Sequence, residues 1–164
     1  MNLARVQHRG AGFTLFELMI IVAILGILAA VATPMIMTSI PRYRLRAEAR
    51  ELLINFKKVK LEAVKRNRNV VIQFTPGVAP QRGSYLIFVD TDNNNAYADP
   101  PDILLVNQQI REMVLLKSTT FNPAGYNPRG LPLGAANQNV VLETTDGSRQ
   151  YTLTVSQAGA VRLQ

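Results

Sequence analysis

The stretch GFTLFELMIIVAILGILAAVATPMIM, residues 12–37, decides how this chain of 164 residues is organised. Residues 13–37 carry a single charged side chain, that of Glu17. A helix of this length spans roughly 37 Å at about 1.5 Å per residue, which exceeds the ~30 Å hydrocarbon core of a bilayer. We therefore predict a transmembrane helix over residues 13–37.

The residues before the helix indicate how the chain is processed. A secretory signal has an apolar core of only ~7–15 residues, and its small residues follow that core. Here the small residues, 10–12, come before the apolar run and after a basic leader. Cleavage at this point leaves the helix on the mature protein and creates a new amino terminus at Phe13.

Glu17 needs a physical reason, because an unpaired carboxylate just inside a membrane costs a few kcal/mol. A free ammonium on Phe13 would pair with it, in the same chain or in a neighbouring one. Alternatively, the side chain snorkels to the interface from its place near the helix end. Position alone leaves both interpretations open.

The string from Gly12 to Pro34 resembles the class III signal of type IV pilins and type II secretion pseudopilins. The resemblance implies that a prepilin peptidase cuts after Gly12 and methylates Phe13. It implies that Glu17 pairs with the amine of an adjacent subunit during assembly. Pro34 falls on the usual proline of that helix and predicts a kink or local melting there, and Pro41 predicts an end of the helix or a second kink.

The charge pattern and the processing motif disagree on orientation. The leader holds two arginines, whereas four arginines, at positions 42, 44, 46 and 50, follow the apolar run. The positive-inside rule alone would place the C-terminal domain in the cytoplasm. The resemblance instead implies a cytoplasmic leader (1–12), a single pass through the bacterial inner membrane and a periplasmic domain.

Residues 38–68 predict an amphipathic continuation of the helix. Apolar residues recur there at steps of three and four, with Leu53, Leu61 and Val64 expected to widen the stripe. The stripe consists of Leu45, Ala49, Leu52, Phe56, Val59 and Ala63.

Residues 42–68 hold ten of the 18 Lys and Arg residues, so the net charge of +7 belongs mainly to this segment. The cations form a solvated helix face, or they contact anionic headgroups, acidic neighbouring subunits or nucleic acid.

Residues 69–164 change to short alternating runs with turn signals, which predicts an antiparallel β domain. The helix followed by strands gives an α+β class, with the amphipathic half of the helix packed on the sheet. Asp146-Gly147 predicts a hairpin turn, and Asn122–Gly125 a turn. The predicted strands are 70–75, 84–90, 103–107, 113–117, 140–145, 151–155 and 160–163.

The segments LEAVKRNRNVVIQF, SYLIFVDTDNNNAYADPPDILL, NPRGLP and TLTVSQAGAVRL resemble successive parts of the GspH/FimT family. That resemblance implies a pilin-like fold and a structural role as a minor pseudopilin in type II secretion, supporting protein export. Its implied partners are other pseudopilins or pilins, the prepilin peptidase and an inner-membrane assembly platform. The alternative is a FimT-like minor type IV pilin that binds DNA for uptake or primes pilus assembly.

Composition argues against an enzyme. The chain has no cysteine, and its one histidine, His8, lies in the leader. Thiol catalysis and cysteine-based metal sites are therefore excluded, and no motif pairs a nucleophile with a base. We expect no catalytic residues and no cofactor, with calcium as the one exception to consider.

The calcium candidates are Asp90, Asp92, Asn94 and Asp99, with Asp102 further on. Alternate oxygen-bearing residues on a tight loop suit a hard cation. The EF-hand pattern is not met, because Asn95 and Pro101 stand where it requires Gly and Glu. A polar turn of Asp and Asn residues explains the same letters without a metal.

Arg162 is the candidate DNA contact. Many members of this family end in a Gly-Arg-x-Arg pattern, which is associated with DNA binding in FimT-type pilins. Gly159 and Arg162 match it, but Ala160 stands in place of the first arginine. The other interpretation of Arg162 is a solvent-facing cation on an edge strand.

Overall fold

The computed structural model describes residues 13–121, 123–134 and 137–164. In these ranges the chain forms one helix, α1 (Leu15–Arg66), followed by eight strands. It divides into two compact units, residues 1–38 and 39–164. The helix runs unbroken through Pro34 and Pro41, so local melting at Pro34 and an end of the helix at Pro41 are both wrong expectations.

The amphipathic stripe is confirmed in the second unit. All six predicted stripe residues are at most 1% exposed, and they form one side of the hydrophobic core. Leu53 packs against that core, but Leu61 and Val64 are 66% and 51% exposed. The expected widening is therefore wrong at these two positions, because they are rotated away from the stripe at ~100° per residue.

A C-terminal cap ends the helix. Asn67 has a positive φ of 52°, and the Arg68 amide donates to the carbonyl of Ala63 at 3.3 Å. The Asn67 amide donates to the carbonyl of Val64 at 3.4 Å. This pair of bonds is a Schellman motif, and it turns the chain directly into the first strand.

The first sheet has the strand order β3-β2-β1-β5, with every pair antiparallel. Its strands are β1 (Asn69–Thr75), β2 (Ser84–Asp90), β3 (Ile103–Gln109) and β5 (Ala124–Tyr126). The predicted turn at Asn122–Gly125 is wrong in its second half, where β5 begins. A Cβ on Gly125 would lie 2.3 Å from the carbonyl oxygen of Val70, so β5 pairs with β1 this closely only with glycine at that position.

The second sheet has the order β4-β6-β7-β8, also antiparallel. Its strands are β4 (Val114–Thr119), β6 (Gln138–Thr144), β7 (Gln150–Val155) and β8 (Val161–Leu163). The β6–β7 connection carries the predicted Asp146-Gly147 turn, with Gly147 at a φ of 70°.

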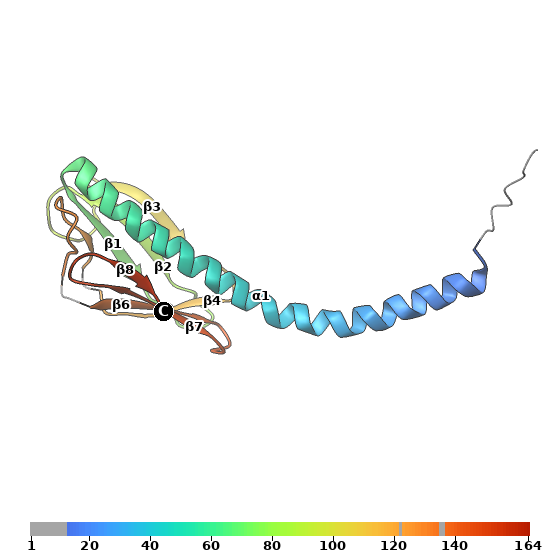
Figure 1. The fold of residues 1–164 in the computed structure, drawn as a ribbon. Helices are drawn as coiled ribbons and strands as arrows, with labels where there is room; N and C mark the ends of the chain where they lie inside the picture. Colours follow the sequence, from blue (N-terminus) through green and yellow to red (C-terminus); the bar gives the residue numbers. More distant parts are fainter. Residues whose placement is uncertain (1–12, 122, 135–136) are drawn as a thin grey trace, which may run out of the picture. The chain divides into compact units, whose positions relative to one another are not determined.

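One hydrophobic core joins the helix to both sheets within the second unit (Figure 1). Phe56 of the helix lies 6.2 Å from the Phe74 ring and 5.5 Å from the Phe121 ring, between ring centroids. Phe74 also lies 6.0 Å from the ring of Tyr85 on β2. This packing of a helix on antiparallel sheets confirms the predicted α+β class.

Candidate assembly site

The N-terminal apolar segment begins with a capped helix turn. The Glu17 amide donates to Oγ1 of Thr14 at 3.2 Å, and the Leu18 amide donates to the Thr14 carbonyl at 3.1 Å. Thr14 is thus the N-cap and Glu17 the third helical residue, as in the Thr-x-x-Glu capping pattern. This role of Thr14 was not predicted, although its spacing to Glu17 is visible in the sequence.

The cap fixes the backbone position of Glu17. It belongs to the first helical turn, where the partial positive charge of the helix favours an anion. Phe13, the predicted new amino terminus, precedes the cap and is 77% exposed. Gly12 lies outside the described residues, so the cleavage junction stays a prediction.

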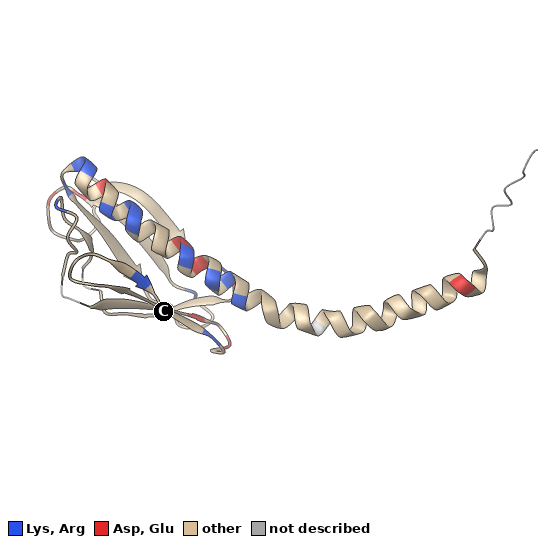
Figure 2. Cartoon of the chain, viewed as in Figure 1, with Lys and Arg blue, Asp and Glu red and all other residues tan. Residues whose placement is uncertain are grey.

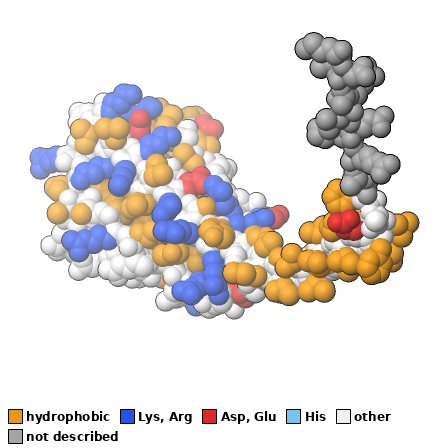
Figure 3. Space-filling view, turned by 45° about the vertical axis from the view of Figure 1, so that its right-hand side comes forward, with side chains coloured by type: hydrophobic (Ala, Val, Ile, Leu, Met, Phe, Trp, Pro, Cys, Tyr) orange, Lys and Arg blue, Asp and Glu red, His pale blue; other side chains and the backbone are white. Residues whose placement is uncertain are grey.

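The segment is apolar around its whole circumference. An 18-residue window of α1 has a mean hydropathy of 2.8 and no residue buried, and the helix is long enough to cross a membrane. Its large side chains are 40% or more exposed from Phe13 to Met37 (Figure 3). Monomeric soluble proteins rarely expose an apolar patch above a few hundred Å². Lipid or other helices must therefore cover this surface.

The helix has features that suit close packing with other helices. A Cβ built on Gly26 would meet nothing within 4 Å, so this position lies open on the helix surface.

Near Pro34, the Thr33 hydroxyl donates to the carbonyl of Ala29 at 2.7 Å and the Thr38 hydroxyl to that of Met35 at 3.1 Å. These hydroxyls are therefore satisfied within the helix, as a membrane requires.

Charged groups are distributed differently over the two parts of α1. Glu17 is the only charged residue between Phe13 and Met37, whereas cations gather along residues 42–66 (Figure 2). Some of these cations are paired: Arg66 Nε lies 2.6 Å from Glu62 Oε2, and Arg44 Nη1 lies 3.1 Å from Glu112 Oε2. Residues 62 and 66 have the i,i+4 spacing that brings two side chains together on a helix surface.

The structure brings three of the acidic residues together. The carboxylates of Asp90, Asp92 and Asp102 each offer an oxygen within 4.8 Å of the others. Burial raises the pKa of Asp90, and the Asp92 and Asp102 carboxyls raise it further. Asp99 and Asn94 are exposed, and Asp99 does not belong to this carboxylate cluster.

Backbone amides already use the oxygens of the two buried carboxylates. The two Asp90 oxygens accept from Asn94 and Asn95 at 3.2 and 3.1 Å. The two Asp102 oxygens accept from Thr91 and Ala98 at 2.8 and 3.0 Å. The arrangement can organise the loop by itself.

Arg162 lies on β8, an edge strand of the second sheet, and its side chain is exposed. Nearby, Gly159 is fixed by the core: its carbonyl accepts from the Tyr126 hydroxyl at 3.2 Å and from Lys60 Nζ at 3.5 Å. The C-terminal segment is therefore held on the domain, with one arginine directed outward.

Comparisons with known proteins match both parts of the chain. Residues 48–159 match the family described as "Type II transport protein GspH", and residues 7–33 match the "Prokaryotic N-terminal methylation motif".

Two curated proteins are similar in sequence. The "Pilin-like protein PilA1" of Thermus thermophilus is 35% identical over 93% of this chain and 97% of its own length. The "Type IV major pilin protein PilA" of Myxococcus xanthus is 36% identical over 51% of this chain and 38% of its own length.

A solved structure supports the fold. The type IV minor pilin FimU of Pseudomonas aeruginosa aligns with a TM-score of 0.54 at 20% identity, over 75% of this chain and 90% of its own. A family match over more than half of the chain, together with a relative similar along nearly its whole length, identifies this protein as a member of the GspH family of pilin-like proteins, with an N-terminal methylation motif.

Proposed function

We propose that residues 13–37 hold this chain in the bacterial inner membrane, with its C-terminal domain in the periplasm, and that it assembles from there into a pilus-like filament. The observation that carries this proposal is the 18-residue apolar window of α1, of which no residue is buried. In the membrane, lipid covers that surface. In a filament, the same helices of other subunits replace the lipid.

Processing would create a positive charge with which the Glu17 carboxylate can pair. Cleavage between Gly12 and Phe13 by a prepilin peptidase, followed by N-methylation, leaves a cationic amine on Phe13. Thr14 caps the helix through the Glu17 amide, so the backbone of Glu17 is held in the first turn. Pairing between Glu17 and the amine of an adjacent subunit would then set the register, which is the best-attested use of a buried ion pair.

Substitution of Glu17 tests this proposal in cells. Glu17→Ala should leave the amount of membrane-bound subunit unchanged but remove it from the sheared filament fraction. Ile24→Ala, which truncates an exposed apolar side chain of the same helix, is the matched control and should still be incorporated. Normal incorporation of Glu17→Ala would refute the role of Glu17 in setting register.

Two machines use such subunits. The family description supports a minor pseudopilin of type II secretion, which would work with an inner-membrane assembly platform to export proteins. Similarity along nearly the whole chain to a pilin-like protein favours a pilus instead. We give the pilus greater weight, because that similarity covers the apolar helix and the folded domain together.

Deletion of the gene separates the two machines. Loss of surface filaments with normal export would assign the chain to a pilus, and accumulation of exported proteins in the periplasm would assign it to secretion.

If the pilus captures DNA through Arg162, Arg162→Gln should lower DNA uptake without reducing the number of filaments. An uptake rate equal to the wild type would exclude this role.

A further inference from the structure

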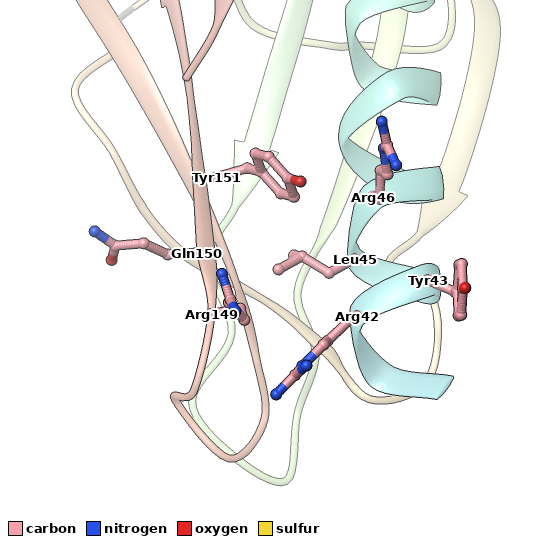
Figure 4. A pocket seen from close by; sticks show the side chains of 7 residues that line it. All are labelled: Arg42, Tyr43, Leu45, Arg46, Arg149, Gln150 and Tyr151. Atoms are coloured by element: carbon pink, nitrogen blue, oxygen red, sulfur yellow. The ribbon is translucent and has the colours of Figure 1, made fainter. Parts of the chain in front are cut away.

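A pocket of about 280 Å³ lies within the unit of residues 39–164, between α1 and the β6–β7 hairpin (Figure 4). Arg42 and Arg46 line it from the helix, and Arg149 lines it from the β6–β7 connection, one residue before β7 begins. Leu45 and Tyr151 point toward one another across the gap. Residues more than 100 positions apart in the sequence therefore build one cationic pocket.

The three arginines have no carboxylate partner among the described residues. Other cations of this domain are paired, such as Arg44 with Glu112 and Lys117 with Glu143. The carboxylate in the hairpin turn is engaged elsewhere, because Asp146 accepts from the Ser148 amide at 3.0 Å. Three like charges around one pocket repel each other, so an anion bound there would be favoured.

The residues that line the pocket indicate which kind of anion it would bind. Guanidinium groups bind phosphate oxygens through two parallel hydrogen bonds. Leu45 is buried and Tyr151 half-buried, so an aliphatic side chain and an aromatic ring with its hydroxyl lie between the arginines (Figure 4). A phosphate attached to an aliphatic group satisfies both surfaces better than a small hydrated anion does.

The chain itself indicates the source of this phosphate. Only residues 38–41 separate Met37, the end of the apolar run, from Arg42. Basic residues directly beside a membrane segment attract anionic headgroups. We propose that the pocket formed by Arg42, Arg46 and Arg149 binds the phosphate headgroup of an anionic phospholipid. This proposal rests on the proposed membrane anchoring only for the source of the ligand.

Binding is measured on the full chain in a neutral detergent, by mass spectrometry of the intact complex. The probes are dihexanoyl-phosphatidylglycerol, dihexanoyl-phosphatidylcholine and inorganic phosphate. We expect the phosphatidylglycerol to bind about tenfold more tightly than the phosphatidylcholine or inorganic phosphate. Only the phosphatidylglycerol combines a net negative charge with an aliphatic part. No filament is involved, so a failure of assembly would not affect this result.

Matched substitutions locate the site. Arg149→Gln should weaken binding of the phosphatidylglycerol about tenfold, whereas Arg162→Gln should leave it unchanged within about twofold. Both arginines are exposed, Arg149 just before β7 and Arg162 on β8, and neither side chain has an ion-pair partner among the described residues. A thermal unfolding curve confirms that both variants are folded.

Three results would overturn the proposal. The first is equal affinity for the two lipids, and the second is an equal effect of the two substitutions, which indicates diffuse attraction. The third is displacement of the lipid by an equal concentration of inorganic phosphate or by a DNA oligonucleotide with the same dependence on Arg149. That result assigns the pocket to phosphate or nucleic acid instead.

Discussion

Glu48 is a buried carboxylic acid of the folded unit. Its side chain is fully buried, and Arg111 Nε lies 3.1 Å from its Oε2. Neither carboxylate oxygen makes a hydrogen bond of good geometry within the described residues. Burial raises the pKa of Glu48, the neighbouring Glu51 raises it further, and Arg111 lowers it. The ion pair therefore offsets only part of the desolvation.

This raised pKa predicts a pH dependence. The pKa of the Glu48 carboxyl is higher in the folded state than its ordinary value of 4.5, which applies to the unfolded chain. The folded state therefore loses stability relative to the unfolded chain as the pH rises above 4.5. Glu48→Gln should therefore gain stability relative to the wild type between pH 4.5 and pH 7. Thermal unfolding at the two pH values measures it, with Glu112→Gln as the exposed control. A stability difference independent of pH would contradict the argument.

Two glycines with similar backbone conformations distinguish the cost of a positive φ from the cost of steric contacts made by an added Cβ. Gly159 and Gly147 have φ values of 73° and 70°. A Cβ on Gly159 would lie 3.0 Å from the Gly130 carbonyl oxygen and from the Tyr126 ring, whereas one on Gly147 meets nothing within 4 Å. Gly147→Ala should cost about 1 kcal/mol of unfolding free energy, and Gly159→Ala about 1–3 kcal/mol more. Equal losses in a denaturant titration would show that crowding at Gly159 is relieved.

At the scale of elements, two leucines of α1 test the orientation of the helix. Leu52 is 0% exposed and Leu61 is 66% exposed. Leu52→Ala should lower the unfolding free energy by about 2–5 kcal/mol, since it leaves a cavity in the core. Leu61→Ala should change it by less than about 0.5 kcal/mol. Denaturation of both variants checks the difference, and a loss at Leu61 would contradict the assigned face.

The loop between β2 and β3 gives a second prediction at this scale. Backbone amides bind both oxygens of Asp90 and both of Asp102, so we expect the loop to hold its shape without calcium. The melting temperature should then be the same in calcium and in a chelator. Calcium at 100 times its dissociation constant would add ~2.7 kcal/mol, a shift that thermal unfolding detects easily. Such a shift, abolished by Asp92→Asn, would establish a metal site.

At the scale of the whole molecule, the features predicted from sequence are those that repeat locally. The stripe from Leu45 to Ala63 and seven of the eight strands follow from periods of 3.6 and two residues. The strand β5 was missed because three residues are too few to show a period, and its pairing depends on Gly125.

Contacts between distant residues could not be predicted. Arg111 reaches Glu48 on α1, and Arg149 joins Arg42 around the pocket, only after the sheets have packed on the helix. No local sequence pattern indicates such a contact. The cap at Thr14 is different, because its spacing to Glu17 was readable in the sequence.

The division into two units predicts that the second folds alone. Among the described residues, every buried hydrophobic side chain lies between Leu45 and Val155, inside the unit of residues 39–164. A fragment of residues 39–164 should therefore be soluble and monomeric without detergent, and should unfold in one cooperative transition. The full chain, with its exposed helix, should need detergent.

Size-exclusion chromatography and circular dichroism check this prediction, and Leu52→Ala in the fragment serves as the internal control. A cooperative transition that this substitution moves to lower temperature would show that the core of the full chain is retained. A fragment that aggregates, or that melts without a transition, would mean that residues 13–38 contribute to folding as well as to assembly.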